Sequence, residues 1–193
     1  MSKKIIFIHG SPRKKGNTSA VSRIAIEAAR SEKAEVTEID ITQLKFNVPG
    51  CAGCMECQQS KEFVCMIRDQ LSEIVFTLPA YDVIAIAAPT YWMSYPAQIK
   101  MLIDRMGSLM KYSDSGEIHT PLAGKVLSIL TTGNGDLKNN LDLLEQQWRN
   151  VAYMLSCNFT SCLIPNVPKE IGTLIDDPLI ALKAQQYGKH LAS

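Results

Sequence analysis

The polar segment at residues 10–19 has the composition of an anion-binding loop. It reads GSPRKKGNTS and joins an apolar run to a segment whose apolar residues have helical spacing. Backbone N–H groups in the first turn of a helix have no partner inside the helix, and the helix dipole attracts negative charge there. The residues that could approach such an anion are Ser11, Arg13, Gly16, Asn17, Thr18 and Ser19. We therefore expect a phosphate site, with an ordinary polar loop and helix cap as the alternative.

Two well-known nucleotide-binding patterns are missing from this loop. It does not end in Gly-Lys-Ser or Gly-Lys-Thr, and it does not contain G-x-G-x-x-G. Their absence from residues 10–19 disfavours an ATPase and an ordinary NAD-binding domain.

Two later loops have the composition expected around a flat ring. Segment 89–96, PTYWMSYP, contains three aromatic residues and a methionine after an apolar run, and segment 131–135, TTGNG, is small and polar. Exposed aromatic surface is costly unless something covers it, and a flat ligand stacks on such side chains while backbone groups bond its polar edge. We expect a flat aromatic ligand here. The alternative is that Tyr91, Trp92 and Tyr95 cover the core or a subunit interface.

Four cysteines form a compact motif in the middle of the chain. Cys51, Cys54, Cys57 and Cys65 give the spacing C-x2-C-x2-C-x7-C, which can bring four thiolates around an iron-sulfur cluster. The same sulfurs could bind tetrahedral zinc, or remain free or redox-active thiols. Spacing leaves these three alternatives open. The two remaining cysteines, at positions 157 and 162, are expected in the core.

Apolar runs alternate with helical periodicities along the chain. Strands are expected at 4–9, 34–41, 83–88, 126–130 and 161–164, and helices at 18–31, 98–110, 141–155 and 177–191. Asn17 or Thr18 is expected to cap the first helix, and Asp177 with Pro178 to begin the last. The alternation predicts an α/β fold, a doubly wound five-stranded parallel sheet with helices on both faces. Ligands of such sheets bind at the carboxyl ends of strands, where all three polar loops fall.

Composition and charge suit a globular protein with no strongly charged surface. The chain has 193 residues, of which 46% are hydrophobic and 20% charged, and its formal net charge is +1. We expect one domain over residues 1–193. The near-neutral charge argues against nucleic acid as a partner, and no apolar stretch approaches the roughly 20 residues of a membrane span. A cytoplasmic location is the expectation, since no signal-type segment is recognisable.

Three segments resemble the NADPH-dependent FMN reductase family of flavodoxin-like proteins. They are IIFIHGSPRKKGNTS, APTYWMSYPAQIKMLIDR and LAGKVLSILTTGNG. The resemblance implies FMN phosphate contacts from Ser11, Arg13, Gly16, Asn17, Thr18 and Ser19. It implies contacts to the isoalloxazine ring from Pro89, Thr90, Tyr91, Trp92, Met93, Thr132, Gly133 and Asn134. We assign no catalytic acid or base, because the cofactor carries the chemistry, and we expect His9, His119 and His190 to be structural.

The resemblance also implies an activity. It is that of an FMN-dependent NAD(P)H oxidoreductase, in which NADPH or NADH reduces bound FMN and the flavin then reduces a small acceptor such as a quinone or a flavin. One alternative is an electron carrier, because the cysteine motif also resembles that of iron-sulfur flavoproteins, with a [4Fe-4S] cluster on Cys51, Cys54, Cys57 and Cys65. The near-neutral charge favours the enzyme over a carrier. A non-catalytic FMN-binding module is the third possibility, and a homodimer or homotetramer is expected in each case.

Overall fold

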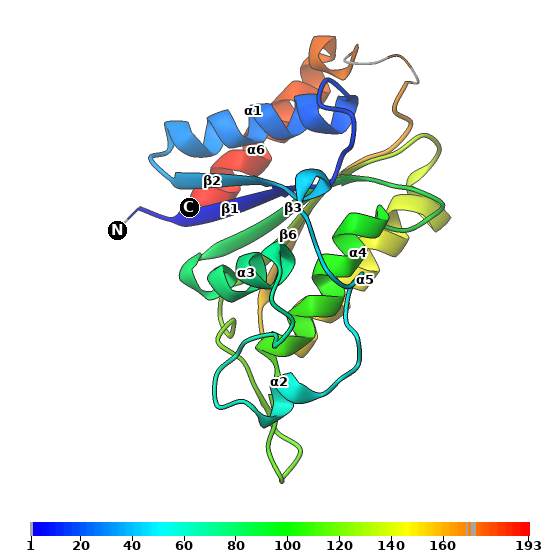
Figure 1. Ribbon diagram of the computed structural model, residues 1–193. Helices are drawn as coiled ribbons and strands as arrows, with labels where there is room; N and C mark the ends of the chain where they lie inside the picture. The colour runs from blue at the N-terminus through cyan, green and yellow to red at the C-terminus, as the bar shows by residue number, and fades with distance from the viewer. Residues whose placement is uncertain (1, 169, 171–172) are drawn as a thin grey trace.

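Five parallel strands form the centre of the protein (Figure 1). The computed structural model describes residues 2–168, 170 and 173–193. The strand order is β2-β1-β3-β6-β7, with each neighbouring pair parallel. The strands are β1 (Lys4–His9), β2 (Glu35–Asp40), β3 (Val83–Pro89), β6 (Val126–Thr132) and β7 (Asn158–Ile164). The predicted five-stranded parallel sheet is confirmed.

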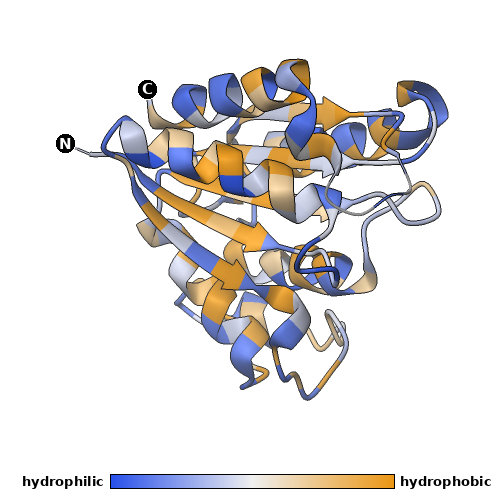
Figure 2. Ribbon diagram, turned by 90° about the horizontal axis from the view of Figure 1, so that it is seen from above, coloured by the Kyte–Doolittle hydropathy of each residue, from blue (hydrophilic) through white to orange (hydrophobic). Residues whose placement is uncertain are grey.

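Helices cover both faces of the sheet. One face carries α1 (Asn17–Ser31) and α6 (Pro178–Ala192), and the other carries α3 (Gln70–Thr77), α4 (Ala97–Arg105) and α5 (Asp142–Met154) (Figure 1). The apolar run of β1, residues 5–8, is buried on both faces of the sheet. Ile5 and Phe7 belong to the cluster beneath α1, whereas Ile6 and Ile8 belong to the cluster beneath the other helices. Strands buried on both faces are hydrophobic at successive positions, as the orange strands in Figure 2 show.

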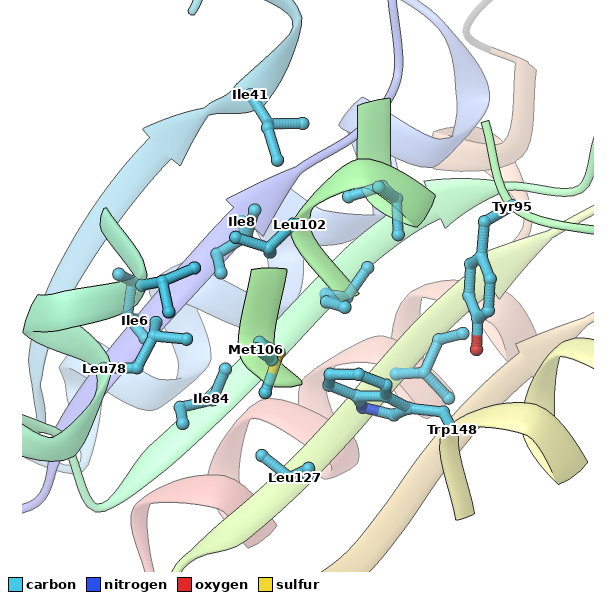
Figure 3. Close-up of a cluster of buried hydrophobic side chains, with 14 of the residues drawn as sticks. Ile6, Ile8, Ile41, Leu78, Ile84, Tyr95, Leu102, Met106, Leu127 and Trp148 are labelled. Carbon is cyan, nitrogen blue, oxygen red and sulfur yellow. The ribbon is translucent and has the colours of Figure 1, made fainter. Parts of the chain in front are cut away.

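Two aromatic side chains are anchored by hydrogen bonds in the cluster beneath α4 and α5 (Figure 3). The hydroxyl of Tyr95 donates to Leu144 O at 2.5 Å, and Nε1 of Trp148 donates to Ser128 O at 3.0 Å. Burial raises the pKa of Tyr95 above its usual value. Tyr95 therefore ties the aromatic segment after β3 to α5, which fixes where α4 begins.

Local details differ from the expectations at several ends. The first helix begins after Gly16, which is its N-cap, so neither Asn17 nor Thr18 caps it. The helix expected to reach residue 110 ends at Arg105 and continues as one 3-10 turn. Asp177 does cap the last helix, by accepting N–H groups of the two residues after Pro178.

Three short elements were not anticipated. They are α2 (Glu56–Gln59), α3 and a hairpin of β4 (Lys111–Tyr112) with β5 (Ile118–His119). The signal for α3 was present, because Asp69 caps the helix by accepting the N–H of Ser72 at 3.0 Å. An acidic residue before an apolar, helix-periodic run is a helix start. No described helix is long and apolar enough to cross a bilayer.

The close approach of α1 and α6 gives a test of the fold. A Cβ at position 188 would overlap the carbonyl oxygen of Ala25, so Gly188→Ala should lower the free energy of unfolding by about 1–3 kcal/mol. Gly107→Ala is the matched control, because no atom lies within 4 Å of its added Cβ. We expect the control to change stability by less than about 0.5 kcal/mol. Urea denaturation measures both, and equal midpoints would contradict the packing.

Candidate functional site

The three polar loops meet at one cavity beyond the carboxyl ends of β1, β3 and β6. Its volume is about 360 Å³. The lining residues are Ser11, Arg13, Gly16, Asn17, Thr18, Pro89, Thr90, Tyr91, Thr132, Gly133, Asn134, Val167 and Pro168. The three loops singled out in the sequence therefore lie together at one cavity. Among the predicted residues, only Ser19, Trp92 and Met93 are outside this lining.

The first loop is folded around a single carbonyl group. The oxygen of Arg13 accepts the N–H of Gly16 and the hydroxyl of Ser19, each at 2.9 Å. Ser19 thus stabilises the loop from outside the cavity lining. A Cβ at Gly16 would lie 2.9 Å from Arg13 Cβ and 3.0 Å from Arg13 O, so only glycine fits this turn without displacement.

The start of α1 supplies anion-binding groups. No described side chain caps this helix, and its first turn contains no acidic residue. The N–H groups of a first helical turn have no acceptor within the helix, and their dipoles favour a negative ligand. Arg13 is the one charged side chain among the residues that line the cavity. This end of the cavity therefore suits a phosphate group.

A buried pair of hydroxyls joins the first loop to the third. The Oγ1 atoms of Thr18 and Thr132 are 2.6 Å apart, and both residues are buried. Each hydroxyl has one proton, and only one of the two protons lies between the oxygens. The second proton stays available for a neighbouring acceptor.

Backbone hydrogen bonds hold the remaining loops in register. The N–H of Thr90 donates to Thr132 O at 2.9 Å, and the N–H of Gly133 donates to Ile164 O at 3.1 Å. The N–H of Val167 donates back to Gly133 O at 3.0 Å. Because the loop after β7 lies against the third loop, Val167 and Pro168 join the lining. The sequence analysis missed these two residues. Ligands bind beyond the carboxyl ends of parallel strands, and the same rule applied to β7 would have pointed to the loop that follows it.

Asn17 connects the first loop to the loop after β7. Its Nδ2 donates to Pro168 O at 3.1 Å and to Glu170 O at 3.0 Å. The side chain was expected among the phosphate donors. The structure places Asn17 in the cavity lining but uses its amide to hold the cavity wall.

The aromatic loop makes a tighter turn than its composition suggested. Tyr91 and Ser94 exchange two backbone hydrogen bonds, of 2.9 and 3.1 Å. The two residues between them, Trp92 and Met93, have φ values of 49° and 58°, in the left-handed region that most side chains avoid. Trp92 is 95% exposed, and Tyr91 is the residue of the turn that lines the cavity. Trp92 and Met93 are therefore outside the cavity lining, whereas the resemblance implied that they contact the ring.

Two buried hydroxyls have no hydrogen-bond partner in the described part of the chain. They are Oγ1 of Thr90 and Oγ1 of Thr131. Thr90 lines the cavity, whereas Thr131 does not. A buried polar group without a partner is costly, so the hydroxyl of Thr90 is suited to bond a ligand in the cavity.

None of the four cysteines of the motif lines this cavity. Cys51 and Cys54 are exposed, and Cys57 and Cys65 are half-buried. Within the described residues, no three His, Cys, Asp or Glu side chains are grouped so that they could hold a metal ion. The four sulfurs, in this arrangement, do not fit an iron-sulfur cluster or zinc.

The other two cysteines and His9 have structural environments. Burial raises the pKa of each of the thiols Cys157 and Cys162 to about 11, which makes them poor nucleophiles. Burial also lowers the pKa of His9, against the opposing effect of Glu38, whose carboxylate lies 3.1 Å from the ring.

The fold is that of flavodoxin-like reductases. The structure of an NAD(P)H:quinone oxidoreductase from Methanothermobacter marburgensis matches with a TM-score of 0.76 over 99% of this chain and 100% of that one. The sequence identity is 16%, so this likeness concerns the fold alone. The model of the NADPH-dependent FMN reductase family matches residues 3–163, and the chain belongs to that family of oxidoreductases.

Two curated relatives match about half of this chain. An iron-sulfur flavoprotein of Archaeoglobus fulgidus is 35% identical over 103 residues, which are 53% of this chain and 45% of that protein. An FMN-dependent NADH:quinone oxidoreductase of Polaromonas naphthalenivorans is 32% identical over 111 residues, 55% of this chain and 47% of that protein. The chain spans about half the length of these relatives.

The unpartnered hydroxyls give a matched test of the cavity. Thr90→Val and Thr131→Val each replace a buried, unsatisfied hydroxyl with a methyl group, so each should raise the stability of the ligand-free protein by about 1 kcal/mol. Only Thr90→Val should weaken binding of FMN, by about five- to tenfold, because only Thr90 lines the cavity. Urea denaturation and flavin fluorescence titration measure the two effects. Equal FMN affinities in both variants would rule out a ligand bond from Thr90.

Proposed function

We propose that this chain binds FMN in the cavity and acts as an FMN-dependent NAD(P)H oxidoreductase on a small acceptor, with the cavity built within one domain. The observation that carries the proposal is the convergence of three strand-end loops on a cavity that begins at a helix start that no described side chain caps. Family membership supports FMN as the ligand. The first turn of α1 would hold the phosphate, and the loops after β3 and β6 would hold the ring.

The residues present fit this cofactor. The first turn of α1 and Arg13 supply donors for a dianionic phosphate, and the Thr18–Thr132 pair has one proton left to donate. Pro89 and Tyr91 supply apolar wall, and the hydroxyl of Thr90 is a free buried partner for a polar edge. The cavity thus has a polar end and an apolar wall, which is the arrangement that a phosphorylated aromatic ligand requires.

The protein's part in the reaction is orientation and electrostatics. When bound, FMN would supply the chemistry, which is electron transfer between NADPH or NADH and a second substrate. Among the described lining residues, none is His, Asp, Glu, Lys or Cys. The contribution expected of this chain is therefore to bind the phosphate and to orient the ring by hydrogen bonds and dipoles.

A quinone is the acceptor that we favour, and a homodimer or homotetramer is the assembly. The relative from Polaromonas naphthalenivorans is named for quinone reduction, which supports the acceptor class. The almost fully exposed Trp92, on a strained turn beside the cavity, supports contact with a second copy of the chain. A sedimentation mass equal to one 21.3 kDa chain at micromolar concentration would contradict the assembly.

The phosphate assignment can be tested by comparing FMN with riboflavin. Arg13→Ala should weaken FMN binding about ten- to a hundredfold, because a charge-assisted hydrogen bond to the phosphate is lost. Riboflavin, which lacks the phosphate, should bind the variant and the unmodified protein equally. Lys15→Ala is the control, since this exposed neighbouring cation does not line the cavity. Equal losses for both ligands in Arg13→Ala would place the phosphate elsewhere.

The second candidate is an electron carrier of the iron-sulfur flavoprotein type. The relative from Archaeoglobus fulgidus bears that name, and the cysteine loop carries donors to its sulfurs, such as the N–H of Gly53, 3.4 Å from Cys51 Sγ. This candidate requires the loop to rearrange, because the sulfurs are not grouped for a metal in the described chain.

One anaerobic preparation separates the two candidates. We expect flavin absorbance that NADPH bleaches and a quinone restores, with negligible iron and acid-labile sulfide. About four iron atoms per chain, with broad visible absorbance lost in Cys54→Ser, would favour the carrier. A colourless protein that does not bind added FMN would refute both.

A further inference from the structure

One buried guanidinium holds both ends of the cysteine loop, defined here as residues 48–65. Arg105 is the last residue of α4, and its side chain is completely buried. At the start of the loop, it donates through Nη2 to Val48 O at 3.0 Å and through Nε to Gly50 O. At the end of the loop, Nη1 lies 3.4 Å from Cys65 Sγ, an N–H···S hydrogen bond. The two ends are thus fixed to the same group.

The guanidinium is itself fixed by an acidic partner. Asp69 Oδ2 accepts from Nη2 at 3.0 Å, and Ser72 Oγ lies 2.5 Å from Nη1. Burial opposes ionisation of Asp69, but hydrogen bonds from the backbone of Ser72 and Asn47 and from Arg105 outweigh it, so the pKa of Asp69 is lowered. The pair is therefore charged and has little freedom to move.

A second cation contacts the middle of the loop. Lys111, just beyond α4 and its 3-10 turn, donates through Nζ to Cys57 O at 2.9 Å and to Ser60 O. Its ammonium group also lies 5.5 Å from the centre of the Phe63 ring. Contacts from this region therefore reach the beginning, middle and end of the cysteine loop.

The helix that carries Arg105 begins just after the aromatic turn that follows β3. Tyr95, which is anchored to Leu144 O, lies two residues before α4, and the helix runs from Ala97 to Arg105. A nine-residue helix is stiff over its length of about 12 Å. Its two ends thus fix the cysteine loop and the aromatic turn relative to each other.

We propose that Arg105 is a positioning residue for the cysteine loop, tying both of its ends to α4 and presenting an N–H donor to the sulfur of Cys65. The loop is held in this way before any metal, disulfide or other partner forms at the cysteines. The simpler alternative is a buried ion pair that serves only to neutralise Asp69. The alternative does not require the guanidinium to reach Val48, Gly50 and Cys65, whereas the positioning role does.

Conservative substitution separates these two roles. Arg105→Gln removes the charge, and Arg105→Lys keeps a charge for Asp69 but cannot reach acceptors on both ends of the loop, because an ammonium group lacks the planar fork. We expect Arg105→Lys to have a urea midpoint closer to that of the unmodified protein than Arg105→Gln. In both variants, amides of residues 48–65 should exchange with solvent about tenfold faster or more, with those of α1 and α6 unchanged.

The measurement is hydrogen exchange by mass spectrometry on the full chain. Arg149→Lys is the control, because Arg149 is an exposed arginine on another helix, paired with Glu145 at 3.0 Å, and should leave the loop unaffected. If Arg105→Lys keeps both the urea midpoint and the slow loop exchange of the unmodified protein, then Arg105 serves only to neutralise Asp69 and the proposal is wrong. The exchange measurement requires no bound flavin, so its outcome does not depend on whether the chain binds FMN.

A second variant covers the case in which Arg105→Gln does not fold. Cys65→Ala removes only the sulfur acceptor, so exchange should rise about severalfold at residues 61–66. The amides of Val48 and Gly50 should be unchanged, because the contacts of Arg105 to the carbonyls of these two residues remain. Unchanged exchange throughout the loop in Cys65→Ala would overturn the role of the sulfur contact.

Discussion

The N–H groups in the first turn of α1 need partners outside the helix, and the site depends on where the sheet places that turn. Parallel strands end at a common edge, so α1 begins beside the loops that follow β3 and β6. The hydrogen bond between Thr18 and Thr132 then joins the helix start directly to the end of β6. A strand pairing that moved β6 from beside β3 would remove both the wall and this bond.

The position of α1 is in turn fixed by close packing on the face away from the other helices. The contact between Gly188 and Ala25 lets the backbones of α6 and α1 approach more closely than any larger residue permits. Asn17 adds a polar connection between α1 and the loop after β7. The helix start that forms the polar end of the cavity is thus held by α6, by β6 and by the last loop together.

The opposite face of the sheet provides a second fixed element. Residues buried beneath α4 and α5 anchor Tyr95 at one end of α4, and the Arg105–Asp69 pair anchors the other end. Burying two charges is costly unless they are paired and bonded to further groups, and Arg105 meets that condition through the carbonyls of Val48 and Gly50. The loop with four cysteines is therefore folded as a consequence of core packing.

The sequence alone predicted the alternation of strands and helices and the parallel sheet. It also predicted that the three polar loops lie at one edge of that sheet. These follow from local hydrophobic periodicity and from the rule that parallel strands share one carboxyl edge. The tertiary structure decided which side chains face the cavity. Trp92 and Met93 are outside its lining because two hydrogen bonds between Tyr91 and Ser94 make the turn too tight, and Val167 and Pro168 enter it because β7 pairs beside β6. Arg105 had no recognisable role in the sequence, since its partners lie 33 to 57 positions away and are brought to it only by packing.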